Sequence, residues 1–252
     1  MKIIAITQAR TGSSRFPKKI LKKIGGKSLL EIHIERIRQS SFIDQIIIAT
    51  TNNDRDNIIL DYAKSLKVEC FRGDENDVLD RFYKSVANIH PDYIVRLTSD
   101  CTLIDAKLID EIIACALKKN LDYYSNILSP SYPDGQDIEV FKFTALYKAW
   151  KMAKLSDDRE HVTPFIKNNS SFMGSNLFTS ENHKHKDDYN QVRIVVDYPE
   201  DFTVIKMLIQ KLGTDANWID YAKEYIKNAS INKNNMMIKR NDGYKKSKIK
   251  IS

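Results

Sequence analysis

Residues 2–19 decide the fold class, and they read KIIAITQARTGSSRFPKK. The first part, Lys2–Ile6, is a short apolar run that predicts a buried strand. A polar loop follows at once. It holds four cations, Arg10, Arg15, Lys18 and Lys19, and no acidic residue. Ligands of open α/β sheets bind beyond the carboxyl ends of the strands. The stretch therefore predicts an α/β fold with an anion-binding loop after its first strand.

The small residues of this loop also suit an anion. Backbone amides and hydroxyls at Gly12, Ser13 and Ser14 can approach an oxyanion closely, as a triphosphate requires. Because Gly12 is its single glycine, the loop matches neither the dinucleotide-binding G-x-G-x-x-G pattern nor a Walker A loop. The alternative is an exposed basic loop, but the position after the first strand favours phosphate binding.

Outward from the loop, strand-like and helix-like segments alternate as far as residue 119. Ser28 and Glu31 form a capping box that predicts a helix to about Gln39, and Asp54 is a candidate cap for the next helix. This rhythm is typical of a mostly parallel sheet covered by helices on both faces. The predicted strands are 45–49, 68–71 and 93–97, and the predicted helices are 29–39, 54–66, 76–89 and 106–119.

After Leu121 the rhythm changes, but the sequence shows neither a linker nor a repeat. A loop rich in Pro, Ser and Gly covers 127–136, and Pro199 fits the first turn of a helix that continues to residue 212. We expect one domain over residues 1–228, in which 120–190 form a lobe inserted late in the fold. Further strands are predicted at 137–141, 172–177 and 191–196, and further helices at 145–153, 160–167 and 218–226.

Composition and charge narrow the class of protein. The 252 residues are 42% hydrophobic, and no apolar run approaches the roughly 20 residues of a membrane span. Three separated cysteines, Cys70, Cys101 and Cys115, form neither a disulfide framework nor a zinc pattern, which favours the reducing cytoplasm. Residues 232–252 hold seven cations and one acid, so they carry +6 of the net charge of +7. We expect 229–252 to be a basic, flexible tail, of which 232–252 are dispensable for function; the alternative is contact with nucleic acid or an anionic membrane.

Two aspartates follow apolar runs that predict buried strands: Asp100 closes VRLTSD and Asp197 closes VRIVVD. Strand ends are a usual place for ligands of Mg²⁺, which takes one or two carboxylates and completes its shell with water and phosphate oxygens. If both residues bind one ion, their carboxylates must lie close together in the folded chain. Each aspartate could instead be a helix cap.

Taken in order, several segments resemble the cytidylyltransferase superfamily, which includes CMP-Kdo synthetases and acylneuraminate cytidylyltransferases. The resemblance covers about residues 1–226 and is greatest to the branch of spore-coat polysaccharide biosynthesis. The stretches that carry it are 8–19 QARTGSSRFPKK, 72–73 RG with 77–82 DVLDRF, 96–101 RLTSDC, 132–141 YPDGQDIEVF, 159–164 REHVTP and 196–202 VDYPEDF.

This resemblance implies a fold, a reaction and partners. The fold is a single α/β domain with a mixed, mostly parallel sheet, like that of nucleotide-diphospho-sugar transferases. The reaction is transfer of CMP from CTP to a sugar, such as a nonulosonic or Kdo-like acid, with release of pyrophosphate, for a surface polysaccharide or glycan. Mg²⁺ is the implied cofactor and a homodimer the implied assembly, with no nucleic acid partner and no stable membrane insertion. The lobe 120–190 is then expected to serve sugar binding or dimerisation.

The site residues are assigned by motif match to this family. Arg10, Arg15, Lys19 and Asp100 are implied to be catalytic, and Asp100 and Asp197 to bind the metal. CTP is assigned to Ala9, Arg10, Gly12, Ser13, Ser14, Arg15, Lys19 and Thr98, with Arg72 and Asp80 near the base and ribose. The sugar is assigned to Asp134, Gln136, Glu139, Arg159 and His161, although Arg159 and His161 also suit the first turn and the packing of a helix.

The sequence departs from the branch at three positions. Lys18 stands where the branch usually has Gly, Thr102 where it has Pro, and Gln136 where it has an apolar residue, so the identity of the sugar stays open. A glycosyltransferase of related fold is the alternative enzyme, although residues 100–102 lack the D-x-D pair usual there. A nucleic-acid-binding module is another alternative, and it predicts strongly salt-dependent binding without turnover.

Overall fold

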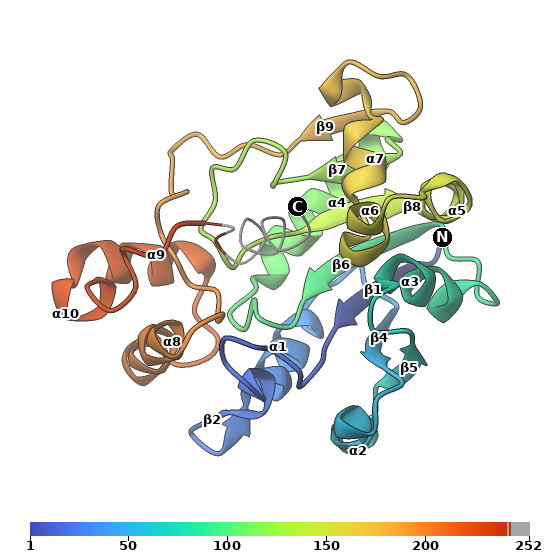
Figure 1. The fold of residues 1–252 in the computed structure, drawn as a ribbon. Helices are drawn as coiled ribbons and strands as arrows, with labels where there is room; N and C mark the ends of the chain where they lie inside the picture. Colours follow the sequence, from blue (N-terminus) through green and yellow to red (C-terminus); the bar gives the residue numbers. More distant parts are fainter. Residues whose placement is uncertain (241, 243–252) are drawn as a thin grey trace.

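Seven strands form one sheet in the computed structural model, which describes residues 1–240 and residue 242 (Figure 1). Their order across the sheet is β5-β4-β1-β6-β8-β7-β9, so the first strand of the chain lies well inside it. The strands are β1 (Ile3–Gln8), β4 (Gln45–Thr51), β5 (Glu69–Gly73), β6 (Tyr93–Thr98), β7 (Tyr123–Ser125), β8 (Glu139–Lys142) and β9 (Ser180–Asn182). A separate hairpin pairs β2 (Lys23–Ile24) with β3 (Lys27–Ser28).

The sheet is mixed and mostly parallel, as the sequence predicts. Strands β5, β4, β1 and β6 run parallel, whereas β8 runs antiparallel to its neighbours β6 and β7. Side chains of β1 alternate between the two faces of the sheet: Ile3 and Ala5 enter one apolar cluster, and Ile4 and Ile6 enter another. All four are buried, because helices cover both faces.

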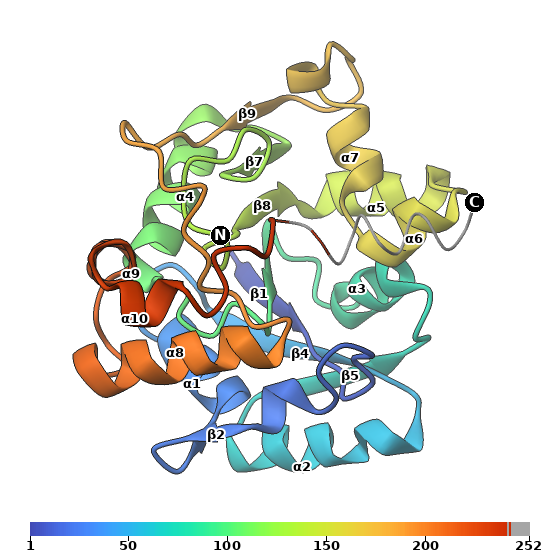
Figure 2. The ribbon, with the colours of Figure 1, turned by 60° about the vertical axis from the view of Figure 1, so that its left-hand side comes forward.

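Three helices pack on each face of the sheet. One face carries α1 (Leu29–Ile37), α2 (Asn57–Ser65) and α4 (Ala106–Lys119), and the other carries α3 (Val78–Val86), α5 (Phe143–Met152) and α7 (Pro164–Asn168). Beside α1 lies a third group of helices, α8 (Pro199–Leu212), α9 (Trp218–Lys227) and α10 (Ala229–Asn232) (Figure 2). The other helical segments are α6 (Ser156–His161) and the 3₁₀ turns η1 (Lys19–Leu21), η2 (Asp54–Asp56) and η3 (Ser171–Met173). In the part of the chain that the structure describes, no helix is both long and apolar enough to cross a membrane.

Local caps explain where several helices begin. The predicted capping box at Ser28 is confirmed: its hydroxyl accepts from the Glu31 amide, and the Glu31 carboxylate accepts from the Ser28 amide. The cap predicted at Asp54 is wrong, because α2 begins only after a 3₁₀ turn and the Asp54 side chain makes no capping bond there. Its neighbour Asp56 accepts instead from the amide and the hydroxyl of Thr11, both at 2.7 Å, and so anchors the loop after β1.

Two predicted strands are wrong. Residues 191–196 form no strand and make only an isolated bridge, Asp134 to Arg193; their alternate apolar side chains pack against α8 and α9. Residues 172–177 contain the end of η3 and a turn at Gly174, whose φ of 82° breaks an extended run. The strand of this region is β9, at the edge of the sheet.

The expected tail begins inside the fold. Ile231 is buried in the third cluster, and Asn235 is 1% exposed. The segment 233–240 therefore continues across the body of the protein, and most of the residues that follow lie outside the described part of the chain. The flexible tail expected from residue 229 is thus packed against the domain as far as residue 240.

The departure at Lys18 has a backbone explanation. Lys18 has φ 56° and ψ 26°, the left-handed conformation that glycine adopts without a steric penalty. Its amide donates to the Thr11 carbonyl at 3.0 Å, which closes the loop after β1. The glycine usual in the branch suits this conformation, and here a lysine adopts it.

A buried histidine couples the sheet to the segment after β6. His33 on α1 bonds Thr7 Oγ1 through Nε2 and the Cys101 carbonyl through Nδ1, both at 2.9 Å. Complete burial lowers the pKa of His33 to about 4, so the imidazole is neutral near pH 7.

We expect the stability contributed by His33 to fall as the pH drops from 7 to 5. In the unfolded chain the imidazole titrates near its ordinary pKa of about 6.5, whereas in the folded chain it stays neutral until about pH 4. The unfolded state therefore binds more protons in this window, which removes roughly 2 kcal/mol by pH 5. Urea unfolding of the wild type and of His33→Gln at both pH values isolates this contribution. The wild type should lose more free energy of unfolding than the variant; equal losses would contradict the assignment.

Candidate active site

The loop after β1 is held in one shape before any ligand is considered. The Asp56 carboxylate accepts from the amide and the hydroxyl of Thr11 in the loop, and the Lys18 amide donates to the Thr11 carbonyl across it. A Cβ at Gly12 would lie 2.6 Å from the Arg55 guanidinium, so glycine allows that side chain to lie over the loop. Arg55 is about half exposed and could move aside for a larger residue, and Gly12 does not line the cleft next to the loop.

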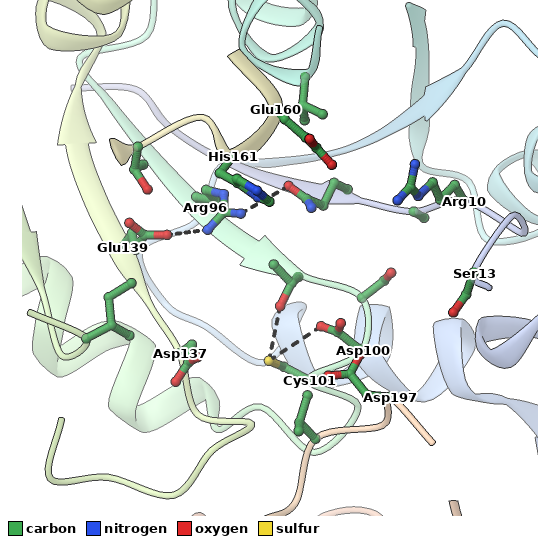
Figure 3. Close-up of a pocket in the computed structure, with 18 of the residues that line it drawn as sticks. Arg10, Ser13, Arg96, Asp100, Cys101, Asp137, Glu139, Glu160, His161 and Asp197 are labelled. Carbon is green, nitrogen blue, oxygen red and sulfur yellow. Dashed lines mark hydrogen bonds and ion pairs between the residues drawn. The ribbon is translucent and has the colours of Figure 1, made fainter. Parts of the chain in front are cut away.

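A cleft of about 540 Å³ opens at the carboxyl ends of β1 and β6. Its lining confirms that many residues far apart in the sequence meet at one place (Figure 3). The predicted site residues that line it are Ala9, Arg10, Ser13, Ser14, Arg15, Lys19, Thr98, Asp100, Asp134, Glu139, His161 and Asp197. The structure thus brings the loop, both aspartates and part of the expected sugar set into one cavity.

The two aspartates meet at one ammonium group. Lys19 Nζ donates to Asp100 Oδ2 at 3.1 Å and to Asp197 Oδ1 at 2.8 Å. They are brought together by a backbone bond, in which the Val196 amide donates to the Asp100 carbonyl at 3.0 Å. Neither aspartate is a helix cap, because α4 is capped by Asp105 and α8 begins after Tyr198. The proximity that a shared ion requires is therefore present.

Charge in this cluster is strongly coupled. Burial opposes ionisation of Asp197, but the ammonium of Lys19 overcomes it and lowers the pKa of Asp197 to about 2, with help from Arg15 at 3.2 Å and Arg193 at 3.6 Å. Burial likewise opposes the charge on Lys19, and the two carboxylates raise its pKa. Asp197 and Lys19 are therefore both ionised near neutral pH.

The loop side of the cleft carries further cations. Arg10 Nη1 pairs with Glu75 Oε1 at 3.1 Å and remains about half exposed, so it is held loosely at the mouth. Arg81 on α3 lines the same side, and burial, together with the nearby charge of Arg10, lowers its pKa to about 10. Arg81 therefore remains a cation at neutral pH and adds to the positive potential on this side.

The opposite wall is a row of three carboxylates from residues 134–139, each paired with an arginine of another segment. The pairs are Asp134–Arg193 at 2.7 Å, Asp137–Arg240 and Glu139–Arg96. Burial and repulsion from Asp137 raise the pKa of Asp134 to about 7, whereas Arg96 and Lys167 outweigh burial and lower the pKa of Glu139. This wall presents hydrogen-bonding groups of both signs with little net charge.

His161 and Cys101 complete the lining. His161 lies above Arg96 (Figure 3), with Nε2 3.7 Å from Asp157, and burial lowers its pKa. Burial also raises the pKa of the Cys101 thiol well above its ordinary value, and Cys101 Sγ bonds the Thr98 hydroxyl at 3.2 Å. The thiol is therefore a packing group rather than a nucleophile.

Two residues assigned to the sugar lie away from the cleft. Gln136 is fully buried; its side chain accepts from the Asp105 amide at 3.0 Å and donates to the Leu103 carbonyl at 2.7 Å. It fixes the segment between β6 and α4. Arg159 pairs with Asp77 and donates to the Trp150 carbonyl at 2.9 Å, so it joins α6 to α3 and α5.

Two residues assigned near the base and ribose also lie outside the lining. Arg72 donates to the carbonyls of Thr51 and Asn53, at 2.9 and 3.1 Å. Asp80 accepts from the Trp150 indole at 2.8 Å. Both are used to hold neighbouring segments in place.

Sequence reasoning missed several residues that line the cleft, which are Gln8, Glu75, Arg81, Arg96, Lys167 and Arg240. Arg81 and Arg96 lie in the stretches 77–82 and 96–101 that resemble the family. Their charge beside a predicted site residue could therefore have indicated that they line the cleft. Arg240 lies in a segment of basic, low-complexity composition, and only the fold shows that it reaches the cleft.

The residues present fit a hard divalent cation such as Mg²⁺. Asp100 and Asp197 are carboxylates that already converge on one cation, the Lys19 ammonium, and Asp197 is ionised. Among residues 1–240 and 242 no group of three or more His, Cys, Asp or Glu is placed to hold a metal by itself. A two-carboxylate site would therefore rely on phosphate oxygens and water for the rest of the coordination shell.

Comparison with known proteins places the chain in a protein family. The model of the cytidylyltransferase family matches residues 4–234. An uncharacterized protein of Methanocaldococcus jannaschii is 48% identical over 175 residues, 69% of this chain and 70% of that protein. The spore coat polysaccharide biosynthesis protein SpsF of Bacillus subtilis is 33% identical over 216 residues, 84% of this chain and 88% of that protein.

Solved structures agree with these matches. A cytidylyltransferase from Leptospira borgpetersenii superposes with a TM-score of 0.85 at 30% identity, over 92% of this chain and 96% of that one. A CMP-Kdo synthetase complexed with CTP superposes with a TM-score of 0.61 at 13% identity, over 84% of this chain and 99% of that one, which shows a shared fold. The α/β architecture, the cleft and these matches together establish that the chain belongs to the cytidylyltransferase family.

Proposed function

We propose that the enzyme transfers CMP from CTP to a hydroxyl of a sugar and releases pyrophosphate. The observation that carries this proposal is the convergence of Lys19 with Asp100 and Asp197 beside a loop of cations in one cleft. Likeness to SpsF supports a role in making a surface polysaccharide or glycan. The family match favours nucleotidyl transfer over the alternative of glycosyl transfer.

In this proposal the loop side of the cleft binds the triphosphate. Arg10 and Arg15 supply guanidinium forks, Lys19 supplies a point charge, and the segment with Ser13 and Ser14 supplies short polar groups. These cations offset the charge that builds up on the leaving pyrophosphate, which is the main requirement of phosphoryl-type transfer. Arg10 is held only at the mouth, so it is free to exchange Glu75 for a phosphate.

Asp100 and Asp197 are the residues that would hold Mg²⁺. When bound, the ion neutralises phosphate charge and favours ionisation of the attacking hydroxyl. The remaining contribution comes from the chain itself, since the carboxylates and Lys19 fix where the reacting phosphate sits.

The transfer follows from these positions. The sugar hydroxyl releases its proton to solvent and forms a bond to the α-phosphorus, while the bond from that phosphorus to the pyrophosphate oxygen breaks and the pyrophosphate leaves with that electron pair. The wall of paired carboxylates and arginines, 134–139 with its partners, faces the loop across the cleft and orients the sugar. An acidic sugar is the acceptor we propose, because Lys167 lines this part of the cleft and no ion pair engages it within the described chain.

The proposed function includes an oligomeric state and a cellular compartment. We propose a homodimer, which sedimentation of the purified chain would test. The three cysteines are unpaired, which supports a reducing compartment such as the cytoplasm.

The nucleotide and the acceptor can be tested together. We expect pyrophosphate release only when CTP and a sugar are both present, measured for each of the four NTPs against a panel of acidic sugars that includes 3-deoxy-manno-octulosonate. Comparable turnover with ATP or UTP would reject the cytidylyl assignment while leaving nucleotidyl transfer in place. Absence of turnover with every pair would contradict the proposed function.

Substitution of the aspartates tests the shared site. Asp100→Asn and Asp197→Asn keep side-chain size and remove charge, so each should remain folded, lose about 100-fold or more in turnover and need more Mg²⁺ for the remainder. The double variant should be little worse than either single variant, because residues that act as a unit are not additive. Asp61→Asn, on the exposed side of α2, is the matched control and should behave as wild type. Multiplicative losses in the double variant would show that the two carboxylates act independently.

A further inference from the structure

The C-terminal segment enters the cleft, and its course is fixed by buried contacts. The side-chain Nδ2 of Asn235 donates to the Arg193 backbone carbonyl at 3.2 Å and to Asp201 Oδ1 at 2.8 Å, and Asn235 Oδ1 accepts from the Tyr225 hydroxyl at 2.9 Å. Arg193 is the partner of Asp134 in the cleft wall. Asn235 is therefore bonded directly to a residue of the cleft wall, and this contact sets the position of Arg240 five residues later.

Arg240 joins its own segment to two others that are remote in sequence, 132–137 and the loop at Asn190. Its Nη1 donates to the Tyr132 carbonyl at 2.9 Å and to Asn190 Oδ1 at 3.1 Å, and its Nη2 pairs with Asp137. The side chain is 12% exposed and lines the cleft. The family model ends at residue 234, so this contribution lies beyond the matched region.

Asp137 is the part of this arrangement that a ligand can reach. Arg240 engages Oδ1, and 27% of the Asp137 side chain stays exposed on the lining of the cleft. Burial raises the pKa of Asp137, and the guanidinium of Arg240 is the main opposing influence. Glu139 and Asp100 add negative potential nearby, so without Arg240 the charge of Lys167 would be the main influence that opposes them.

The position of Asp137 identifies the ligand it faces. Figure 3 shows Arg10 and Ser13 at one side of the cleft, Asp137 and Glu139 at the other, and Asp100 with Asp197 between them. If the triphosphate occupies the side of Arg10 and the reacting phosphate lies at the aspartates, then the acceptor sugar occupies the side of Asp137. This step rests on the proposed function.

We infer that Arg240 is a positioning residue for the acceptor sugar: it fixes the Asp137 carboxylate so that its free oxygen accepts hydrogen bonds from sugar hydroxyls. Carboxylates paired with guanidinium groups offer acceptors and donors with little net charge, which suits the polyhydroxyl part of a sugar rather than its acidic group. Loss of Arg240 would leave an uncompensated carboxylate that repels an anionic acceptor.

Steady-state kinetics of full-length variants test this role. Pyrophosphate release is measured while CTP and the acceptor are varied in turn, with 3-deoxy-manno-octulosonate as the first acceptor and then the best sugar of the panel. Arg240→Gln should raise KM for the acceptor about tenfold or more and leave KM for CTP within about twofold, the loss expected for one charged hydrogen bond. Arg240→Lys should recover part of the loss, because a charge without the fork geometry remains.

Lys239→Gln is the matched control, because it removes the same charge from the neighbouring exposed residue. It should leave both KM values unchanged. Asp137→Asn keeps the shape of the wall and should raise the acceptor KM as Arg240→Gln does. It also carries the test if Arg240→Gln does not fold. Adding Arg240→Gln to Asp137→Asn should change little more, since both act through one contact.

Three results would overturn the inference. The first is an acceptor KM that is unchanged both in Arg240→Gln and in Asp137→Asn. The second is a KM for CTP that rises in Arg240→Gln as much as the KM for the acceptor. The third is a rise in acceptor KM in Lys239→Gln equal to that in Arg240→Gln. Each leaves cytidylyl transfer by the wild type intact. A wild type that turns over no pair of nucleotide and sugar instead contradicts the proposed function, and with it this role of Arg240.

Discussion

The site depends on one buried ammonium placed between two carboxylates. Lys19 is 9% exposed, and its charge is stable there only because Asp100 and Asp197 both accept from it. That contact joins three parts of the chain: the loop after β1, the end of β6 and the segment before α8. Much of the fold serves this arrangement. Parallel β1 and β6 bring the first two parts to one edge, and the bond from Val196 to Asp100 brings the third.

The same constraint explains the charge pattern of the cleft. A buried charge without a partner would be costly, so acids and cations alternate across the cavity. Asp134, Asp137 and Glu139 each have a guanidinium partner on one side of the cleft, whereas Arg10 and Arg81 leave the loop side more positive. In the proposed function, a triphosphate would supply the negative charge that the loop side lacks, and the acceptor would bind at the other side.

Several regular elements could be predicted from the sequence, because they follow from local periodicity, but the predicted helix 160–167 is broken at Val162, whose φ is 72°. The strand before the loop, the capping box at Ser28 and the helix after Pro199 were each predicted and are present. Residues 191–196 could not be predicted correctly, since alternating apolar residues that pack on helices look the same as residues of a sheet.

The site shows the same division between local signals and tertiary ones. The charged loop and the two aspartates could be identified from composition, position and family resemblance. Gln136 and Arg159 were assigned to the sugar, yet their side chains fix backbone carbonyls, an amide and a neighbouring helix, which only tertiary structure reveals. Arg240 was missed because lysine-rich ends of chains are usually solvated, and its role depends on the anchor at Asn235.

The central claim is that the α-phosphorus of CTP moves to the sugar, and following the phosphorus atoms tests it most directly. Phosphorus NMR of the enzyme with Mg²⁺, CTP and an acceptor sugar distinguishes the products by their phosphate groups. Our account predicts that pyrophosphate and a phosphodiester joining CMP to the sugar appear together in equal amounts. Formation of CDP with inorganic phosphate or a phosphorylated sugar, or of CMP without a sugar phosphodiester, would contradict it.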